Sequence, residues 1–121
     1  MLRSYRDLLV WQKAIEFAIL IYRLSDGFPR TESYGLTSQM RRASVSVPSN
    51  IAEGYGRGSR KEYLQFLFIA QGSSKELETQ TILSQPLSYA TAARADRILS
   101  EAEVVGKMPA SLIRSLKPKT A

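Results

Sequence analysis

The run from residue 36 to residue 58 reads LTSQMRRASVSVPSNIAEGYGRG, and its apolar spacing decides the fold class. Apolar residues recur there at steps of four, three, four and four, the spacing of one buried face of a bundle helix. Pro48 lies inside the pattern, where a proline removes a backbone donor and crowds the carbonyl group of Ser44. Because the spacing keeps its phase across Pro48, the sequence predicts one helix over residues 32–53, kinked at this proline. The residues of the predicted buried face are Leu36, Met40, Ala43, Val47 and Ile51.

A glycine-rich stretch follows, and we expect it to end this helix. Gly54, Gly56 and Gly58 stand at alternate positions and suit a tight reversal of the chain. The next residues, Ser59 to Glu62, form a capping box, the pattern that begins a helix. A third helix is therefore predicted over residues 60–85, with Pro86 marking its end.

Two further helices complete the predicted fold. The first covers residues 7–25 and the last covers residues 92–114, with Thr91 as the N-terminal cap of the last. We expect Pro109 to interrupt the apolar face of the last helix. No stretch alternates apolar and polar residues as a strand does. The sequence thus predicts an all-α protein, an antiparallel up-and-down four-helix bundle whose single domain spans residues 1–121.

The first helix carries more apolar surface than one bundle needs. Two apolar stripes of helical spacing overlap on it, one starting at Leu8 and the other at Val10. One stripe of somewhat over 100° is enough for a helix packed inside a small bundle. The surplus surface predicts contact with another copy of the chain. The residues expected at this interface are Leu8, Trp11, Ile15, Phe17, Ile21 and Tyr22.

Composition excludes several classes of catalyst. The 121 residues include no cysteine and no histidine, which removes thiol nucleophiles, thiolate metal sites, Ser-His-Asp triads and the commonest metal ligand. Glu76 and Glu78 are near in sequence, but on a helix they diverge by about 200° and share no site. We therefore expect no enzyme activity, no catalytic residue, no metal and no cofactor. No apolar run reaches the ~18–20 residues of a membrane span and the N-terminus has no signal-peptide layout, so we expect a cytoplasmic protein.

Charge gives the positive evidence for a partner. The chain carries 17 Lys and Arg against 11 Asp and Glu, a formal net charge of +6. A cluster of five basic residues lies between positions 41 and 61, where Glu53 is the one acidic residue. The cluster predicts contacts with the phosphates of RNA or DNA, since polyanions attract clustered cations and a helix N-terminus also favours anions. The predicted residues are Arg41, Arg42, Arg57, Arg60 and Lys61.

The same residues have structural explanations as well. The glycine stretch is consistent with a plain turn between helices, and Tyr55 with packing at a helix end as an alternative to stacking on a base. Arg41 and Arg42 stand about 100° apart on a helix. One of them can therefore pair with Glu53 or with a carboxylate of a neighbouring helix while the other faces solvent.

The run of residues 36–58 resembles the bacterial four-helix bundle proteins encoded in intervening sequences of 23S rRNA genes. Gln-x-Arg-Arg, the proline inside a helix and Asn-Ile-Ala-Glu-Gly carry the resemblance, with support from residues 5–14, the Phe28-Pro29 turn and residues 70–79. Related proteins act beside the reverse transcriptases of diversity-generating retroelements. The resemblance implies a bundle that assembles as a homopentamer, with a basic surface proposed to contact nucleic acid or a polymerase.

Two hypotheses of function follow. The leading one is a small, basic, non-catalytic oligomer that binds RNA or DNA through phosphate contacts. The alternative is a protein-interaction scaffold, in which the oligomer holds a partner such as a reverse transcriptase.

Overall fold

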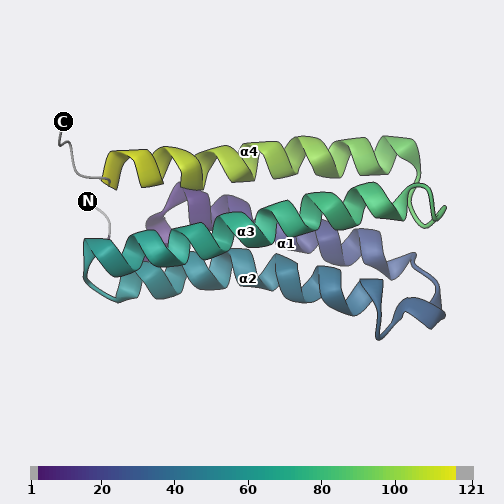
Figure 1. Ribbon diagram of the computed structural model, residues 1–121, viewed down its shortest axis with the longest axis horizontal. Helices are drawn as coiled ribbons and strands as arrows, with labels where there is room; N and C mark the ends of the chain where they lie inside the picture. Colours follow the sequence, from purple (N-terminus) through teal and green to yellow (C-terminus); the bar gives the residue numbers. More distant parts are fainter. Residues whose placement is uncertain (1–2, 117–121) are drawn as a thin grey trace.

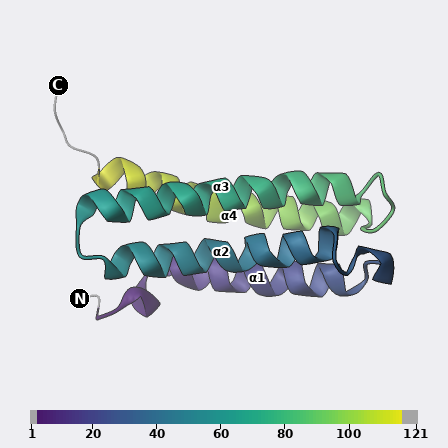
Figure 2. The same cartoon turned by 60° about the horizontal axis from the view of Figure 1, so that its bottom comes forward.

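Four helices make up most of the chain. A computed structural model describes residues 3–116, so residues 1, 2 and 117–121 of the predicted domain lie outside the described part. The helices are α1 (Leu9–Asp26), α2 (Leu36–Gly56), α3 (Arg60–Ser84) and α4 (Ala92–Leu116), with short 3-10 turns η1 (Tyr5–Asp7) and η2 (Arg30–Glu32). Figure 1 shows the chain reversing direction at each connection between helices, and Figure 2 shows α1 with α2 and α3 with α4 as two neighbouring layers. The predicted all-α four-helix fold is confirmed.

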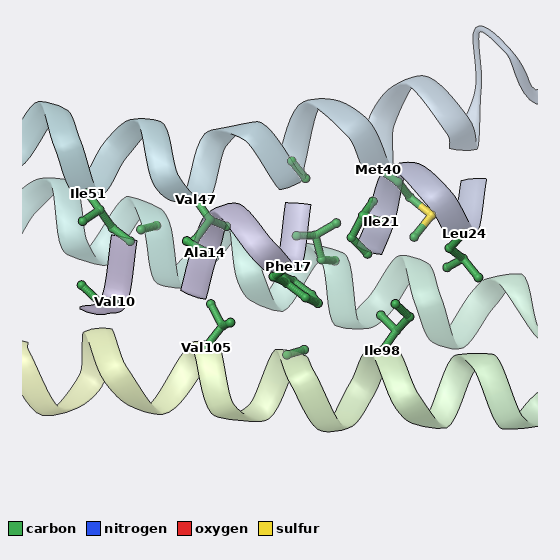
Figure 3. Packing of buried hydrophobic residues seen from close by; sticks show 14 of the residues in the cluster. Val10, Ala14, Phe17, Ile21, Leu24, Met40, Val47, Ile51, Ile98 and Val105 are labelled. Carbon is green, nitrogen blue, oxygen red and sulfur yellow. The ribbon is translucent and has the colours of Figure 1, made fainter. Parts of the chain in front are cut away.

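An apolar core runs along the middle of the bundle. The stripe of α1 that begins at Val10 is buried, because its members recur at three- and four-residue steps and so share one side of the helix. Every residue of the predicted buried face of α2 is buried as well, which confirms that prediction. Figure 3 shows these side chains meeting between the helices, with Ile98 and Val105 entering from α4. Burial of apolar surface is the main driving force for folding, so this core sets how each helix is turned.

The structure places both ends of α2 later than predicted, at Leu36 and Gly56 instead of residues 32 and 53. At its start, the chain first passes through η2, and the Glu32 carboxylate accepts a hydrogen bond of 3.0 Å from the backbone N–H of Leu36. At its end, Gly54 and Gly56 are helical, and of the three glycines Gly58 alone has a positive φ, 79°. The prediction that the helix stops before Gly54 is wrong, because glycine permits a helix to break without forcing it to do so.

The predicted beginnings of α3 and α4 are confirmed by their caps. The Ser59 hydroxyl accepts a hydrogen bond of 3.1 Å from the backbone N–H of Glu62, and the Thr91 hydroxyl accepts one of 3.2 Å from that of Arg94. Caps of this kind satisfy backbone donors that have no partner inside the helix. α3 ends at Ser84, just before Pro86.

Two prolines lie inside helices. α2 continues through Pro48 as one helix, as predicted, while a bend at this position stays a prediction. α4 continues through Pro109 to Leu116, as the predicted helix over residues 92–114 does, but the predicted interruption of its apolar face is wrong. Pro109 is buried, as are Val105 one turn before it and Ile113 one turn after it. We attribute the continuity of α4 to this packing, which offsets the lost backbone hydrogen bond.

α2 and α3 approach each other closely at Gly54. A Cβ atom at this position would lie 2.6 Å from Cβ of Phe66 and 3.2 Å from the ring of Tyr63. The base of the Phe66 side chain cannot swing aside without a shift of the α3 backbone. The short distance between the helices, and not a turn, therefore requires glycine here.

Gly54→Ala should destabilise the protein by about 1–3 kcal/mol, as overpacking does, although alanine favours a helix more than glycine. Gly56→Ala is the matched control, because a Cβ atom there would meet no atom of the described residues within 4 Å. The control should leave the free energy of unfolding unchanged or slightly raised. Chemical denaturation followed by circular dichroism measures both variants, and equal stabilities would contradict the close approach at Gly54.

A hydrogen bond joins two connections between helices. The Tyr89 hydroxyl, between α3 and α4, donates to Oε2 of Glu32 over 2.9 Å, while Oε1 of the same carboxylate accepts from Leu36. The Leu36 N–H, and to a smaller extent the Tyr89 hydroxyl, lower the pKa of Glu32 from its ordinary value. The Tyr89 ring also packs against Phe28, with 5.5 Å between the centroids. The charged form of Glu32 therefore contributes to the stability of the fold.

A carboxyl group whose pKa is lowered on folding stabilises the protein above its unfolded pKa, and this contribution is lost as pH falls through the lower, folded pKa. Glu32→Gln should therefore melt at a lower temperature than the wild type at neutral pH, and the two melting temperatures should converge below about pH 4. Glu101→Gln is the control, because the Glu101 carboxylate forms no hydrogen bond or ion pair within residues 3–116. Thermal unfolding at a series of pH values tests this, and a gap that stays constant with pH would argue against it.

Candidate nucleic-acid interface

Arg41 joins α2 to the end of α1. Its guanidinium group donates to the Ser25 hydroxyl and to the Asp26 carboxylate, each over 2.8 Å, and to the backbone carbonyl of Tyr22 over 3.3 Å. It also lies over the Tyr22 ring, 4.8 Å from the centroid. A cation is favoured near the C-terminus of a helix, where the helix dipole is negative. Pairing with a carboxylate of a neighbouring helix is therefore the arrangement observed for Arg41.

Arg57 lies between two carboxylates at the turn from α2 to α3. Its guanidinium nitrogens are 2.9 Å from Oε1 of Glu53 and 3.7 Å from Oε2 of Glu62. The same group lies over the Phe66 ring, 5.1 Å from the centroid. The two carboxylates weaken the attraction of Arg57 for a phosphate.

Arg42, Arg60 and Lys61 are exposed and form no ion pair within residues 3–116. Arg60 and Lys61 stand in the first turn of α3, where the helix dipole favours an anion. Arg42 is on α2, and the stretch from Arg42 to Gly56 is about 21 Å long at ~1.5 Å per residue. The structure therefore brings Arg57, Arg60 and Lys61 together but separates them from Arg41 and Arg42.

Tyr55 packs against α3. Its ring meets the ring of Tyr63 edge-on, with 6.0 Å between the centroids. Burial, and to a smaller extent the neighbouring Tyr55, raise the pKa of the Tyr63 hydroxyl. These contacts support the packing explanation for Tyr55.

A furrow runs along the outside of the bundle between α1 and α2. One cavity of about 280 Å³ and another of about 460 Å³ lie in it, and both are lined by Ile15 and Ala18. Three of the predicted interface residues, Trp11, Ile15 and Tyr22, line these cavities. We name this surface the α1–α2 furrow, and define it by Trp11, Ile15, Ala18, Tyr22, Val45 and Pro48.

Phe17 and Ile21 do not belong to the furrow, and their prediction as interface residues is wrong. Their side chains are 1% and 0% exposed, so no surface remains for a second copy. Figure 3 shows both of them inside the core, because they belong to the stripe of α1 that starts at Val10. Leu8 is half-buried against the core, and its part in an interface stays a prediction.

Three arginines outside the predicted set come together between α1 and α4. Arg23 lies in the last turn of α1, and Arg94 and Arg97 lie near the start of α4. All three line one cavity of about 160 Å³. The three-residue spacing of Arg94 and Arg97 on a predicted helix was the signal available in the sequence. Nothing in the sequence connects them with Arg23, which is 71 residues from Arg94.

Two kinds of site are absent from the described part of the chain. Its acidic residues form no group of three or more that could hold a metal ion. Among residues 3–116, no helix combines the length and apolar character needed to cross a membrane.

Known proteins of similar sequence and structure agree with the four-helix fold described above. The model of a family described as 23S rRNA-intervening sequence protein matches residues 6–111. A crystal structure of a protein with unknown function from the S23 ribosomal protein family of Bacteroides thetaiotaomicron is similar to the chain, with a TM-score of 0.81. The two share 25% sequence identity, and the match covers 88% of this chain and 99% of that one. No curated protein matches the chain. Because the family model spans most of the sequence, including residues 36–58, the chain belongs to the 23S rRNA-intervening sequence protein family.

Proposed function

We propose that the protein is a small, basic, non-catalytic bundle that associates with copies of itself and binds RNA or DNA through phosphate contacts. The observation that carries the proposal is the exposure of Arg42, Arg60 and Lys61, which have no acidic partner among residues 3–116. Phosphate contacts supply essentially all of the affinity in sequence-independent binding. They need cations whose charge is not already neutralised by carboxylates.

Arg41 and Arg57 have a smaller part in this proposal than the sequence predicted. Arg41 pairs with Asp26, and Arg57 pairs with Glu53 and Glu62. A phosphate would have to compete with these carboxylates for the same donors. Both arginines therefore serve mainly to hold helix ends together.

The α1–α2 furrow supports self-association. Its exposed members include Val45 and Tyr22, at 45% and 41%, and apolar surface gathered in a groove is typical of contact sites between proteins. The larger furrow cavity is also lined by Asp26 with Arg41, and a separate cavity that shares Ser49 and Ala52 with the smaller furrow cavity is lined by Glu53 with Arg57, so the rim of the furrow offers both signs of charge. Such a rim lets two copies of a basic chain meet without one-sided repulsion.

Association would strengthen weak phosphate binding. Linked sites on one assembly raise avidity by orders of magnitude without any new contact within each site. A homopentamer, which the resemblance implies, is the assembly that we expect.

A second candidate function is a scaffold that holds another protein, such as a reverse transcriptase. Apolar side chains on α3, outside the furrow, favour it: Ile69, Ile82 and Leu83 are 50%, 58% and 47% exposed. Affinity capture from cells treated with nuclease separates the two candidates, because only a partner held by protein contacts survives that treatment.

Val45→Glu should dissociate the assembly, because it buries an unpaired carboxylate in an apolar contact. Val104→Glu is the matched control, since Val104 is 48% exposed on α4, outside the furrow. Light scattering at several protein concentrations measures the mass of each variant. A wild-type protein that stays monomeric at every concentration would contradict self-association, and a Val45 variant of wild-type mass would exclude the furrow.

Joint replacement of Arg42, Arg60 and Lys61 by alanine should weaken the binding of single-stranded RNA by the same factor for every base sequence, since phosphate contacts carry no base identity. Each phosphate contact with a single strand contributes ~0.7 to the slope of log K against log salt. If the three cations contact three phosphates, their loss should make this slope shallower by about 2. Fluorescence anisotropy with a labelled RNA measures both quantities.

The control variant replaces Lys13, Lys75 and Lys107 by alanine. It removes the same charge, but from lysines that already pair with a glutamate one helical turn away. Its salt slope should stay close to that of the wild type. The proposed contacts would be refuted if the RNA affinity of the wild type did not depend on salt concentration, or if the two triple variants changed the affinity and the salt slope equally.

A further inference from the structure

A small cavity between α1 and α4 is bordered by cations alone among its charged groups. It has a volume of about 160 Å³, enough for several water molecules, and no acidic side chain of residues 3–116 lines it. None of its three arginines forms an ion pair within residues 3–116. The cavity is lined by Arg23, Arg94 and Arg97 and by Leu20, Leu24 and Ile98.

The backbone brings these arginines together. Arg94 and Arg97 are three residues apart on α4, so they share one face of that helix. Nη2 of Arg94 donates to the backbone carbonyl of Arg23 over 3.4 Å, which places the start of α4 against the end of α1. The positive end of the α4 dipole therefore lies beside the cavity and favours an anion there.

The acidic groups near the cavity have other partners or other positions. Asp26, at the end of α1, pairs with Arg41 of α2. Glu16 and Glu101 line the neighbouring depression with Arg23 and Arg97, and Glu16 pairs there with Lys13. Asp96 of α4 does not line the cavity.

Because its lining includes three arginines and no acidic residue among residues 3–116, this cavity is suited to an anion. The positive charges of three arginines that line one small space repel each other, and a ligand of concentrated negative charge would remove that repulsion. The planar guanidinium fork matches two oxygens of a phosphate, which a single lysine cannot do.

We propose that the cavity lined by Arg23, Arg94 and Arg97 binds a phosphate group. The phosphate source that we favour, the backbone of a bound nucleic acid, rests on the proposed function. The cavity lies between α1 and α4, whereas Arg42, Arg60 and Lys61 lie on α2 and α3. A nucleic acid that reaches this cavity therefore follows a second face of the bundle.

Inorganic pyrophosphate tests the site without any base or sugar. Added to the intact isotope-labelled protein, it should shift the Nε–H nuclear magnetic resonance signals of Arg23, Arg94 and Arg97 to saturation. Arg97→Gln should weaken this binding about tenfold, the effect of one charge-assisted hydrogen bond. Arg114→Gln is the matched control: Arg114 is also exposed on α4, in its last turn, and the variant removes the same charge. The site would be overturned if the Nε–H signals of every arginine shifted slightly and linearly with pyrophosphate concentration. It would also be overturned if the two variants lost pyrophosphate affinity equally.

Binding of single-stranded RNA by the same two variants identifies the source of the phosphate. A salt slope that becomes shallower by about 0.7 in Arg97→Gln but not in Arg114→Gln assigns the site to the nucleic-acid backbone. Saturable pyrophosphate binding with an unchanged RNA slope supports the site for a free phosphate ligand and overturns the backbone assignment. Saturable binding in a protein that binds no RNA supports the site while removing the proposed function. If the protein binds RNA but shows no saturable signal shift with pyrophosphate, the phosphate site is overturned while the proposed function stands.

Discussion

Burial of the α1 stripe that begins at Val10 is the constraint on which the rest of the structure depends. Phe17 and Ile21 belong to this stripe and are almost completely buried, so α1 can face the core in one orientation only. A helix cannot turn two different stripes toward the same core. The second stripe, with Trp11 and Tyr22, is therefore left along the edge with α2, where it forms one wall of the α1–α2 furrow.

Basic residues in this protein differ in their partners: some hold helix ends, and some form no ion pair within residues 3–116. The end of α1 is held by two arginines from different helices, Arg41 of α2 and Arg94 of α4, which both donate to backbone carbonyls of α1. Arg57 plays a similar part at the turn from α2 to α3. Net charge alone cannot separate these roles, because a cation beside a carboxylate and a free cation count equally. The contacts of each side chain decide which of them can attract a polyanion.

Apolar and cationic surfaces occupy different parts of the bundle and meet at Arg23, which lines both a furrow cavity and the three-arginine cavity. The furrow lies between α1 and α2, and the three-arginine cavity lies between α1 and α4. Arg60 and Lys61 stand in the first turn of α3. Arg94 and Arg97 line neither furrow cavity, so a second copy seated in the furrow would leave these two arginines open, whereas it would come close to Arg23. In the proposed function, self-association and phosphate binding would then act in one assembly, whose affinity would come from many weak contacts.

The sequence by itself determined the fold class and the core face of α2, because a helix that buries one side must repeat apolar residues every three or four positions, and Leu36 to Ile51 do so. It also determined the starts of α3 and α4, since the Ser59 and Thr91 caps are local hydrogen bonds. The tertiary structure decided the features that a local sequence pattern does not determine. The distance between α2 and α3 explains Gly54, where the sequence predicted the end of a helix, and packing keeps the apolar face of α4 continuous at Pro109, where the sequence predicted an interruption of that face. It also decided which stripe of α1 faces inward and which arginines meet carboxylates, because both depend on residues far apart in the chain and close only once the helices have packed.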